Sequence, residues 1–400
     1  MKHTKILSSV CLILTITSIA MGGSIFASRG LGLPYTAPNA RSLGLGGVQL
    51  SNYDTQNISS MNPATMSAIE MTSLSIQYIH DVIKSKDAVS QETSDYGNLQ
   101  GFDFIIPFGK EVSMALSLRP LTRTDYYLNF EVEQSSAVTY LKTIKSSGGL
   151  NAASMSASWG LHSMFKLGMT GHYYFGKFSE GWAVTYNNSG FTSTKDEFTT
   201  RSFGWGYTLG AIVLPLPHLS IGATLTPHST LDTKTDLSST FNDSLLSKEG
   251  SFTYPASWGL GISYRITDLG MVGLDIKSQS WGDLKINERK KTDIKNTLGY
   301  CLGFEIRRSD NPYASYMRRM AYRAGLFYTS LPMLDNAGDS IVESGFSVGL
   351  GLPLMMNKAY IDFAFMMGKR GSIDKNDLEE NIYRFSLNIS GTEKWFQRRY

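Results

Sequence analysis

Residues 258–277 read WGLGISYRITDLGMVGLDIK, and they contain two alternating runs on either side of a short polar turn. In the first run Trp, Leu, Ile and Tyr alternate with Gly, Ser and Arg; in the second, Val, Leu and Ile alternate with Gly, Asp and Lys. Successive residues of a β-strand point to opposite faces of its sheet, so each run predicts a strand with one apolar face. The turn from Thr267 to Gly270 is tight, as expected of the short periplasmic side of a bacterial barrel.

The same alternation recurs along nearly the whole chain, most clearly over 112–119, 219–226, 300–307, 346–354 and 383–390. A soluble β-sandwich alternates in the same way, but the apolar-facing runs are about nine to eleven residues long, enough to cross a bilayer at a tilt. Aromatic residues also gather near the expected strand ends, as membrane interfaces require. They are Tyr126, Tyr127, Tyr173, Tyr174, Trp281, Tyr328, Tyr360, Trp395 and Phe396.

Only a closed barrel leaves no backbone group of a sheet unpaired in lipid. We therefore predict an all-β fold, a transmembrane antiparallel β-barrel of about 14 strands, with about 16 as the alternative. The polar stretches 186–200, 229–253 and 308–318 are expected to form long outer loops. Residues 120–146 are expected to be partly an extended loop, because charged side chains interrupt the pattern there.

Composition narrows the class of protein. Of 400 residues, 12% are aromatic and only 18% are charged, which is too apolar for a disordered chain. Lys plus Arg is 37 and Asp plus Glu is 34; without Lys2 and Lys5 of the leader the balance is 35 to 34. This near-neutral balance argues against nucleic acid as a partner. Of two cysteines, Cys11 lies in the leader and only Cys301 remains, which excludes an internal disulfide and a cysteine zinc site.

The chain divides into four segments. Residues 1–27 have a basic start and an apolar stretch before Ala27, the layout of a signal peptide cut after that residue; a membrane anchor is the alternative. Residues 28–69 are rich in Gly, Ser, Asn and Pro and predict an irregular hatch, or plug, inside the lumen, with a flexible leader as the alternative. The barrel is expected over 70–390, and residues 391–400 form a basic, aromatic C-terminal extension.

A family resemblance rests on short motifs that follow one another in order. Residues 40–48 read ARSLGLGGV, residues 62–64 read NPA, residues 254–261 read YPASWGLG and residues 348–353 read VGLGLP. Together they resemble FadL-type outer-membrane proteins, a group that includes fatty-acid and aromatic-hydrocarbon transporters and the PorV and PorQ proteins of type IX secretion. The resemblance implies a 14-stranded barrel with an N-terminal hatch and a kinked strand that opens a lateral route into the membrane.

The resemblance also implies the hatch and gating positions. These are Gly44, Gly46, Gly47, Asp54, Asn62, Pro63 and Ala64. Eight polar residues of the strands are expected to face the lumen, because a charge facing lipid at mid-depth costs about 2–4 kcal/mol. They are His172, Arg265, Asp275, Lys277, Glu305, Arg307, Arg323 and Arg384. Ladders that anchor the hatch are a more ordinary role for them than catalysis.

The sequence contains neither a His-Glu-x-x-His motif nor a Gly-x-Ser-x-Gly elbow, so we expect no enzyme, no metal and no cofactor. The leading hypothesis is a channel in the cell outer membrane for passive uptake of hydrophobic molecules, such as a fatty acid or hydrocarbon. The alternatives are a PorV-like secretion accessory and a structural barrel. Expected partners are the hydrophobic ligand, outer-membrane lipid, the barrel-assembly machinery during biogenesis and, in the second case, secretion-system subunits.

Two departures from the transporters weigh toward the alternatives. The chain continues past the last expected strand in a Trp-Phe extension that looks more like the PorV-type branch. At 400 residues it is also compact for a fatty-acid transporter, so the outer loops that form the ligand groove are expected to be reduced.

Overall fold

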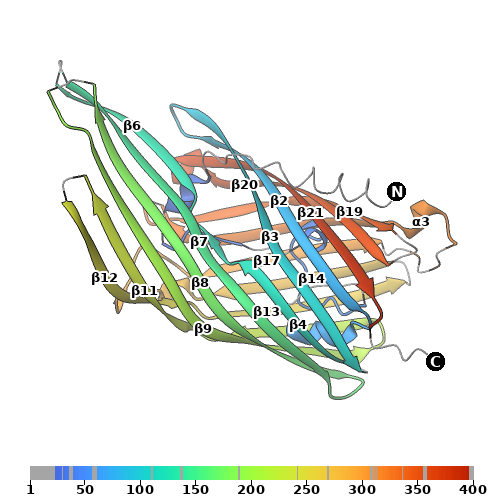
Figure 1. The fold of residues 1–400 in the computed structure, drawn as a ribbon. Coiled ribbons are helices and arrows are strands. Elements are labelled where there is room, and N and C mark those ends of the chain that lie inside the picture. The colour runs from blue at the N-terminus through green and yellow to red at the C-terminus, as the bar shows by residue number, and fades with distance from the viewer. Residues whose placement is uncertain are drawn as a thin grey trace, which may run out of the picture.

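The fold is a closed, antiparallel barrel of 14 strands, which confirms the predicted fold class and excludes the larger strand number. The structure is a computed structural model, and it describes residues 23–395 apart from 29, 36–38, 56–60, 110, 136–137, 188–189, 241, 268–269, 307–308, 310, 312, 336 and 355–357. The first wall strand, β2 (Thr72–Lys86), pairs with the last, β21 (Leu378–Glu393), and so closes the barrel (Figure 1). Pairing thus continues to Glu393, past the expected end of the barrel at residue 390.

The wall strands follow one another in chain order, and three of them are interrupted and carry two labels each. In order they are β2, β3 (Gln91–Gly109), β4 (Val112–Pro120) with β6 (Tyr126–Ser135), β7 (Val138–Gly160), β8 (Phe165–Tyr186), β9 (Thr194–Leu216), β10 (Leu219–Thr226) with β11 (Ser229–Ser239), β12 (Asn242–Tyr254) with β13 (Ser257–Thr267), β14 (Gly270–Gln279), β17 (Thr297–Ile306), β18 (Ala321–Leu334), β19 (Ser340–Leu354), β20 (Ala359–Ser372) and β21.

Strand β17 shows why the sequence forms this wall. Its residues alternate strictly between buried and exposed over its whole length. Leu298, Tyr300 and Phe304 point outward, where lipid replaces water, whereas Cys301 and Glu305 point into the lumen. The apolar outer face and the small or charged inner face are both stabilised only when the sheet closes around a filled lumen.

The strands on one side of the barrel are unusually long. Strands β7 and β9 have 23 residues each and β8 has 22, which corresponds to roughly 75 Å of strand at about 3.3 Å per residue. With β6, β11 and β12 they form one continuous sheet, which we call the outer wall (Figure 1). The expected outer loop at 229–253 is therefore wrong, because these residues are mostly strands of the outer wall, and about half of 186–200 is also strand. Among the described residues of 120–146, where part of the stretch was expected to be loop, only those between β4 and β6 leave the wall.

The outer wall exchanges the polarity of its two faces along its length. On β8, Tyr173 and Phe175 point outward, but the next outward residues are Lys177 and Ser179. From Phe178 onward it is the inner face that carries large apolar side chains. We infer that the bilayer ends at the height of this exchange. Beyond it the outward-facing residues are polar, so the sequence there resembles a loop although it forms strands.

The loop at 308–318 lies at the opposite end from the one expected. Ile306 pairs with Gly270, so β17 ends beside the tight turn that joins β13 to β14. This loop contains α3 (Tyr316–Arg319) and belongs to the end with the short turns, which is the periplasmic end. The expectation of an outer loop was wrong because composition alone does not show in which direction a strand runs.

The N-terminal segment lies inside the barrel (Figure 1). It contains η1 (Ile25–Ser28), β1 (Leu33–Pro34), α2 (Ala40–Gly44) and η2 (Pro63–Ala68), and every residue of α2 is buried. Strand β1 pairs with β5 (Thr122–Arg123), which has left the barrel wall. The remaining elements, η3 (Trp281–Asp283), β15 (Lys285–Ile286), β16 (Arg289–Lys290) and α4 (Ile373–Asn376), lie in outer loops. Among the described residues, none of the helices has the length and hydrophobicity needed to cross a membrane.

Candidate functional site

Arg41 on α2 binds one carboxylate within the hatch and another on the barrel wall. The Asn39 side chain accepts from the Ser42 backbone N–H at 2.8 Å and so caps the helix that carries Arg41. The Arg41 guanidinium donates to both carboxylate oxygens of Asp54, at 3.1 and 2.7 Å. It also donates to both oxygens of Glu305 on β17, at 3.1 and 2.9 Å.

The charges continue around the wall. Arg323 on β18 donates to Glu305 at 2.7 Å and to Asp362 on β20 at 2.7 Å. We call Arg41, Asp54, Glu305, Arg323 and Asp362 the hatch lock. All five are buried, and removing one member of a buried charge pair typically costs about 3–5 kcal/mol. Burial alone lowers the pKa of Arg41, but Asp54 and Glu305 more than compensate, so its pKa lies above the ordinary value.

The glycine cluster forms the tight turn that follows α2. Gly46 and Gly47 have φ angles of 66° and 98°, which favour glycine. A Cβ on Gly46 would lie 2.5 Å from the carbonyl oxygen of Leu326, and one on Gly44 would lie 3.0 Å from the Cα atom of Gly349. The hatch backbone therefore touches the wall backbone directly at this point.

Two charged wall residues bind the backbone of the same turn. The Asp275 carboxylate accepts from the N–H groups of Gln49 and Leu50, at 2.8 and 3.0 Å. The Lys277 ammonium donates to the carbonyl oxygen of Gly47. These wall side chains replace the partners that regular secondary structure would give to an irregular backbone.

The Asn-Pro-Ala turn caps η2 and fixes it against the opposite wall. The Asn62 side chain accepts from the Ala64 N–H at 3.1 Å, and it donates to the carbonyl oxygens of Leu50 at 2.7 Å and Ala211 at 3.2 Å. Pro63 occupies the first turn, where its missing N–H costs nothing. The wall glycines Gly168 and Gly210 leave room for this turn, since a Cβ on either would lie within 2.5 Å of it.

A cavity of about 260 Å³ remains between the hatch and the wall. Strand hydroxyls such as Ser117, Thr226 and Thr329 line part of it, and Tyr174 and Phe327 supply apolar surface. His172 also faces the cavity and is held on both sides. Its Nδ1 lies 2.7 Å from the Ser154 hydroxyl and its Nε2 lies 2.8 Å from the Thr208 hydroxyl. Among the described residues, no three His, Cys, Asp or Glu side chains are grouped as a metal site requires.

The barrel wall is interrupted between β4 and β6. Pro120 still pairs with Asn151 on β7, and pairing resumes only at Tyr126 with Ser146. The residues between turn inward as β5, and the Leu121 N–H donates to the Leu150 carbonyl at 2.7 Å. Above this kink the described parts of β3 and β6 pair only with β2 and β7 respectively, so their other edges have no neighbouring strand. We call the space between these two edges the side opening.

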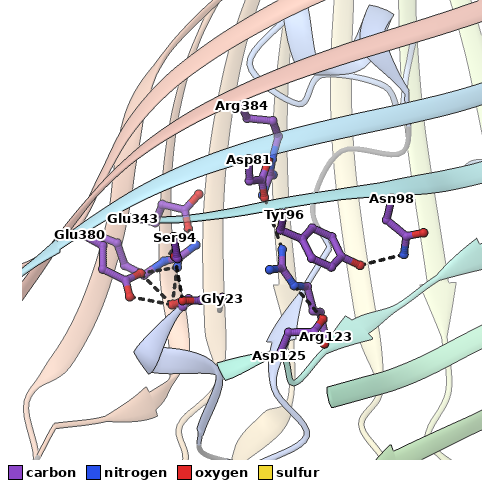
Figure 2. Close-up of polar contacts among 12 residues, drawn as sticks. Gly23, Asp81, Ser94, Tyr96, Asn98, Arg123, Asp125, Glu343, Glu380 and Arg384 are labelled. Atoms are coloured by element: carbon purple, nitrogen blue, oxygen red, sulfur yellow. Dashed lines mark hydrogen bonds and ion pairs between the residues drawn. The ribbon is translucent and has the colours of Figure 1, made fainter. Parts of the chain in front are cut away.

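Arg123 closes the base of the side opening (Figure 2). Its guanidinium carbon lies 3.1 Å from the centre of the Tyr96 ring on β3, and its Nε donates to Asp125 at 3.0 Å. It also lies 3.6 Å from the Asp81 carboxylate on β2, which receives two hydrogen bonds from Arg384 at 2.7 and 2.8 Å. The kinked strand is thus tied to β2, β3 and β21 through charged groups.

The first described residues of the chain bind beside this cluster (Figure 2). The Ser24 hydroxyl lies 2.9 and 2.7 Å from the two carboxylate oxygens of Glu380 on β21. Arg370 on β20 donates to the Ser24 hydroxyl at 2.8 Å and to Glu380 at 2.7 Å. The Ser94 hydroxyl on β3 donates to the Gly23 carbonyl at 3.2 Å.

The predicted lumen residues are thus divided among several places. Asp275, Lys277, Glu305 and Arg323 contact the hatch or its lock, Arg384 lies near the side opening, and His172 faces the cavity. Arg265 is half-buried on the lumen face, where its backbone N–H donates to the His218 carbonyl at 2.8 Å near the periplasmic end. Arg307 lies outside the described residues.

Several buried charged residues of the hatch lock, the kink and the strand ends beside it were missed. Among them are Arg41, Asp81, Arg123, Asp362, Arg370 and Glu380. Because alternate residues of a strand face the lumen, the alternation that placed Arg384 on the inner face would also have placed Asp362, Arg370 and Glu380 there. Arg123 lay in a presumed loop, and no pattern in the hatch pointed to Arg41.

The chain resembles known outer-membrane proteins in sequence family and in fold. A family model described as BamG matches residues 1–400, and no protein of curated function matches the chain. The toluene transporter TbuX of Ralstonia pickettii is 13% identical with a TM-score of 0.63, covering 89% of this chain and 98% of that chain. A FadL homologue of Pseudomonas aeruginosa is 14% identical with a TM-score of 0.65, covering 90% and 99%.

The monoaromatic hydrocarbon channel CymD has the same architecture, at 15% identity and a TM-score of 0.59, covering 92% of this chain and 99% of that chain. These matches confirm the expected FadL-type barrel. At such identities they establish the fold of the chain rather than its ligand.

Proposed function

We propose that this chain, which belongs to the BamG family, is an outer-membrane barrel with a closed lumen that binds a protein partner and assists the assembly or secretion of other proteins at that membrane. The observation that carries this proposal is the outer wall. A barrel that only spans the bilayer needs strands of about nine to eleven residues, and β7, β8 and β9 of the outer wall are about twice as long.

The inner face of the outer wall has the character of a protein-binding surface. Phe130, Trp182, Phe198 and Leu246 lie on this face and are 38–55% exposed. Lys142 lies 4.9 Å from the centre of the Trp182 ring, so charge and aromatic surface alternate there. Large apolar surface exposed to water above a membrane is typical of protein interfaces, where aromatic residues supply much of the binding energy.

The hatch lock supports a role that does not require an open lumen. Release of the hatch would take the Arg41 guanidinium away from the buried Glu305 carboxylate on β17, which would then keep only Arg323. The name of the matched family also supports this proposal, since it points toward the barrel-assembly machinery that we expect among the partners. We assign no reaction to the protein.

A deletion strain tests the proposal directly. We expect its outer membrane to contain less of other barrel proteins or of secreted proteins, measured by quantitative proteomics, while uptake of labelled toluene and oleate stays unchanged. Complementation with the wild-type chain should restore the protein levels. Loss of hydrocarbon or fatty-acid uptake with unchanged outer-membrane protein levels would contradict the proposal.

Passive uptake of a small hydrophobic molecule is the second candidate function. The cavity between hatch and wall favours it, because Tyr174 and Phe327 offer apolar surface to a ligand and the volume of about 260 Å³ fits one aromatic ring. The kink between β4 and β6 is the kind of wall interruption that the FadL-type resemblance implies. Saturable binding of toluene to the purified barrel, lost in a Phe327→Glu variant, would favour this function over the first.

A further inference from the structure

Residues 23–27 pack inside the barrel, although the sequence alone suggests that they are removed with the signal peptide. Gly23, Ser24, Phe26 and Ala27 are all buried, and Ser28 is the first exposed residue after them. We call the described residues from Gly23 to Tyr35, which do not include residue 29, the strap. Cleavage after Ala27 would remove the part of the strap that is held most tightly.

The contacts of this part are specific. Glu380 is fully buried, and it receives hydrogen bonds from the Ser24 hydroxyl and from the Ile25 backbone N–H at 3.0 Å. Phe26 fills a buried apolar cluster with Leu331, Met333 and Ile341. Without residues 23–27, a buried carboxylate would lose two donors and the apolar cluster would lose an aromatic ring, and both losses leave unfavourable vacancies.

The strap also occupies the base of the side opening. Gly23 contacts β3 through Ser94, and a Cβ on Gly23 would lie 2.0 Å from the carbonyl oxygen of Asp125 at the kink. Further along, β1 pairs with β5, where Leu33 and Pro34 lie opposite Arg123 and Thr122. The strap therefore lies against both β3 and the kinked strand, at the place where the wall has no pairing.

We propose that the signal peptide is cut upstream of Gly23, at the bond after Ala20, so that the mature protein keeps the whole strap as the closing element of the side opening. The sequence offers small residues at the two positions that signal peptidases read, Ser18 and Ala20. Hydrolysis adds water across the Ala20–Met21 amide, which leaves a carboxylate on Ala20 and an α-ammonium group on Met21.

The position of the mature N-terminus tests the first half of this proposal. The barrel is purified from outer membranes, its free amines are chemically blocked before digestion, and the N-terminal peptide is identified by mass spectrometry. An N-terminal residue at Met21, or at any position up to Gly23, supports retention of the strap. An N-terminus at Ser28 overturns it, because the contacts of Ser24 and Phe26 would then be absent from the mature protein.

Thiol labelling tests whether the retained strap is seated against Glu380. In a Cys301→Ala background, a Ser24→Cys thiol should react slowly with a membrane-impermeant maleimide, and Glu380→Ala should speed the reaction about tenfold, the factor that about 1.4 kcal/mol produces. The matched control is Ser28→Cys, which is exposed and should react at the same rapid rate with or without Glu380→Ala. Equal, rapid labelling of residues 24 and 28 in the presence of Glu380 would overturn the seated strap.

Discussion

At the scale of single residues, Arg41 is the side chain on which the seating of the hatch depends most. Arg41→Ala leaves Asp54 buried without this partner and Glu305 with Arg323 alone, so we expect a loss of about 3–5 kcal/mol in hatch stability. Hydrogen–deuterium exchange over residues 40–55 should accelerate strongly while exchange in the wall strands stays unchanged. Arg201→Ala is the control, because its ion pair with Asp236 lies on the exposed face of the outer wall; unchanged exchange in both variants would refute the lock.

Alanine substitutions at Gly46 and Gly338 distinguish the cost of backbone strain from the cost of a close contact with the wall. Both have positive φ angles, 66° and 87°, but a Cβ on Gly46 would lie 2.5 Å from the Leu326 carbonyl oxygen, whereas nothing lies within 4 Å of one on Gly338. Either alanine substitution lowers the free energy of unfolding by about 1–2 kcal/mol, because alanine disfavours the left-handed conformation. Gly46→Ala must in addition push the hatch away from the wall. We expect thermal unfolding, followed by gel mobility, to shift clearly more for Gly46→Ala; equal shifts would mean that the turn is loosely seated.

At the scale of elements, the wall strands could be predicted because lipid imposes one rule on all of them. On β17 every outward position from Leu298 to Ile306 is apolar or aromatic, and the sequence alone shows this. Above the bilayer the rule reverses, so β11, with Lys234 and Asp236 on its outward face, looked like a loop. The partners of Arg41 are 13 and 264 positions away along the chain, and no local pattern specifies such a pairing.

The two faces of β8 allow the proposed protein-binding surface to be tested within one element. Trp182 lies on the inner face of the outer wall and Thr185 on the opposite face, and both are exposed. Trp182→Glu should greatly weaken association with the partner without unfolding the barrel, since burying the new carboxylate in an apolar interface is costly. Thr185→Glu adds the same charge and should have no effect. Cross-linking yields in intact cells measure both; equal yields for Trp182→Glu and the wild type would contradict a partner on this face.

At the scale of the whole molecule, barrel, hatch and strap together predict a protein that does not conduct. The hatch lock joins α2 to three wall strands, and Asn62 joins the hatch to the opposite wall, so the plug is fixed on both sides of the lumen. In planar lipid bilayers we expect the wild-type barrel to give no resolved current steps. Arg41→Ala combined with Asn62→Ala removes an attachment on each side and should produce frequent openings, whereas Arg201→Ala should stay silent. Steady current through the wild-type barrel would show that ions pass the seated hatch, and the closed lumen on which the proposed function rests would then have to be abandoned.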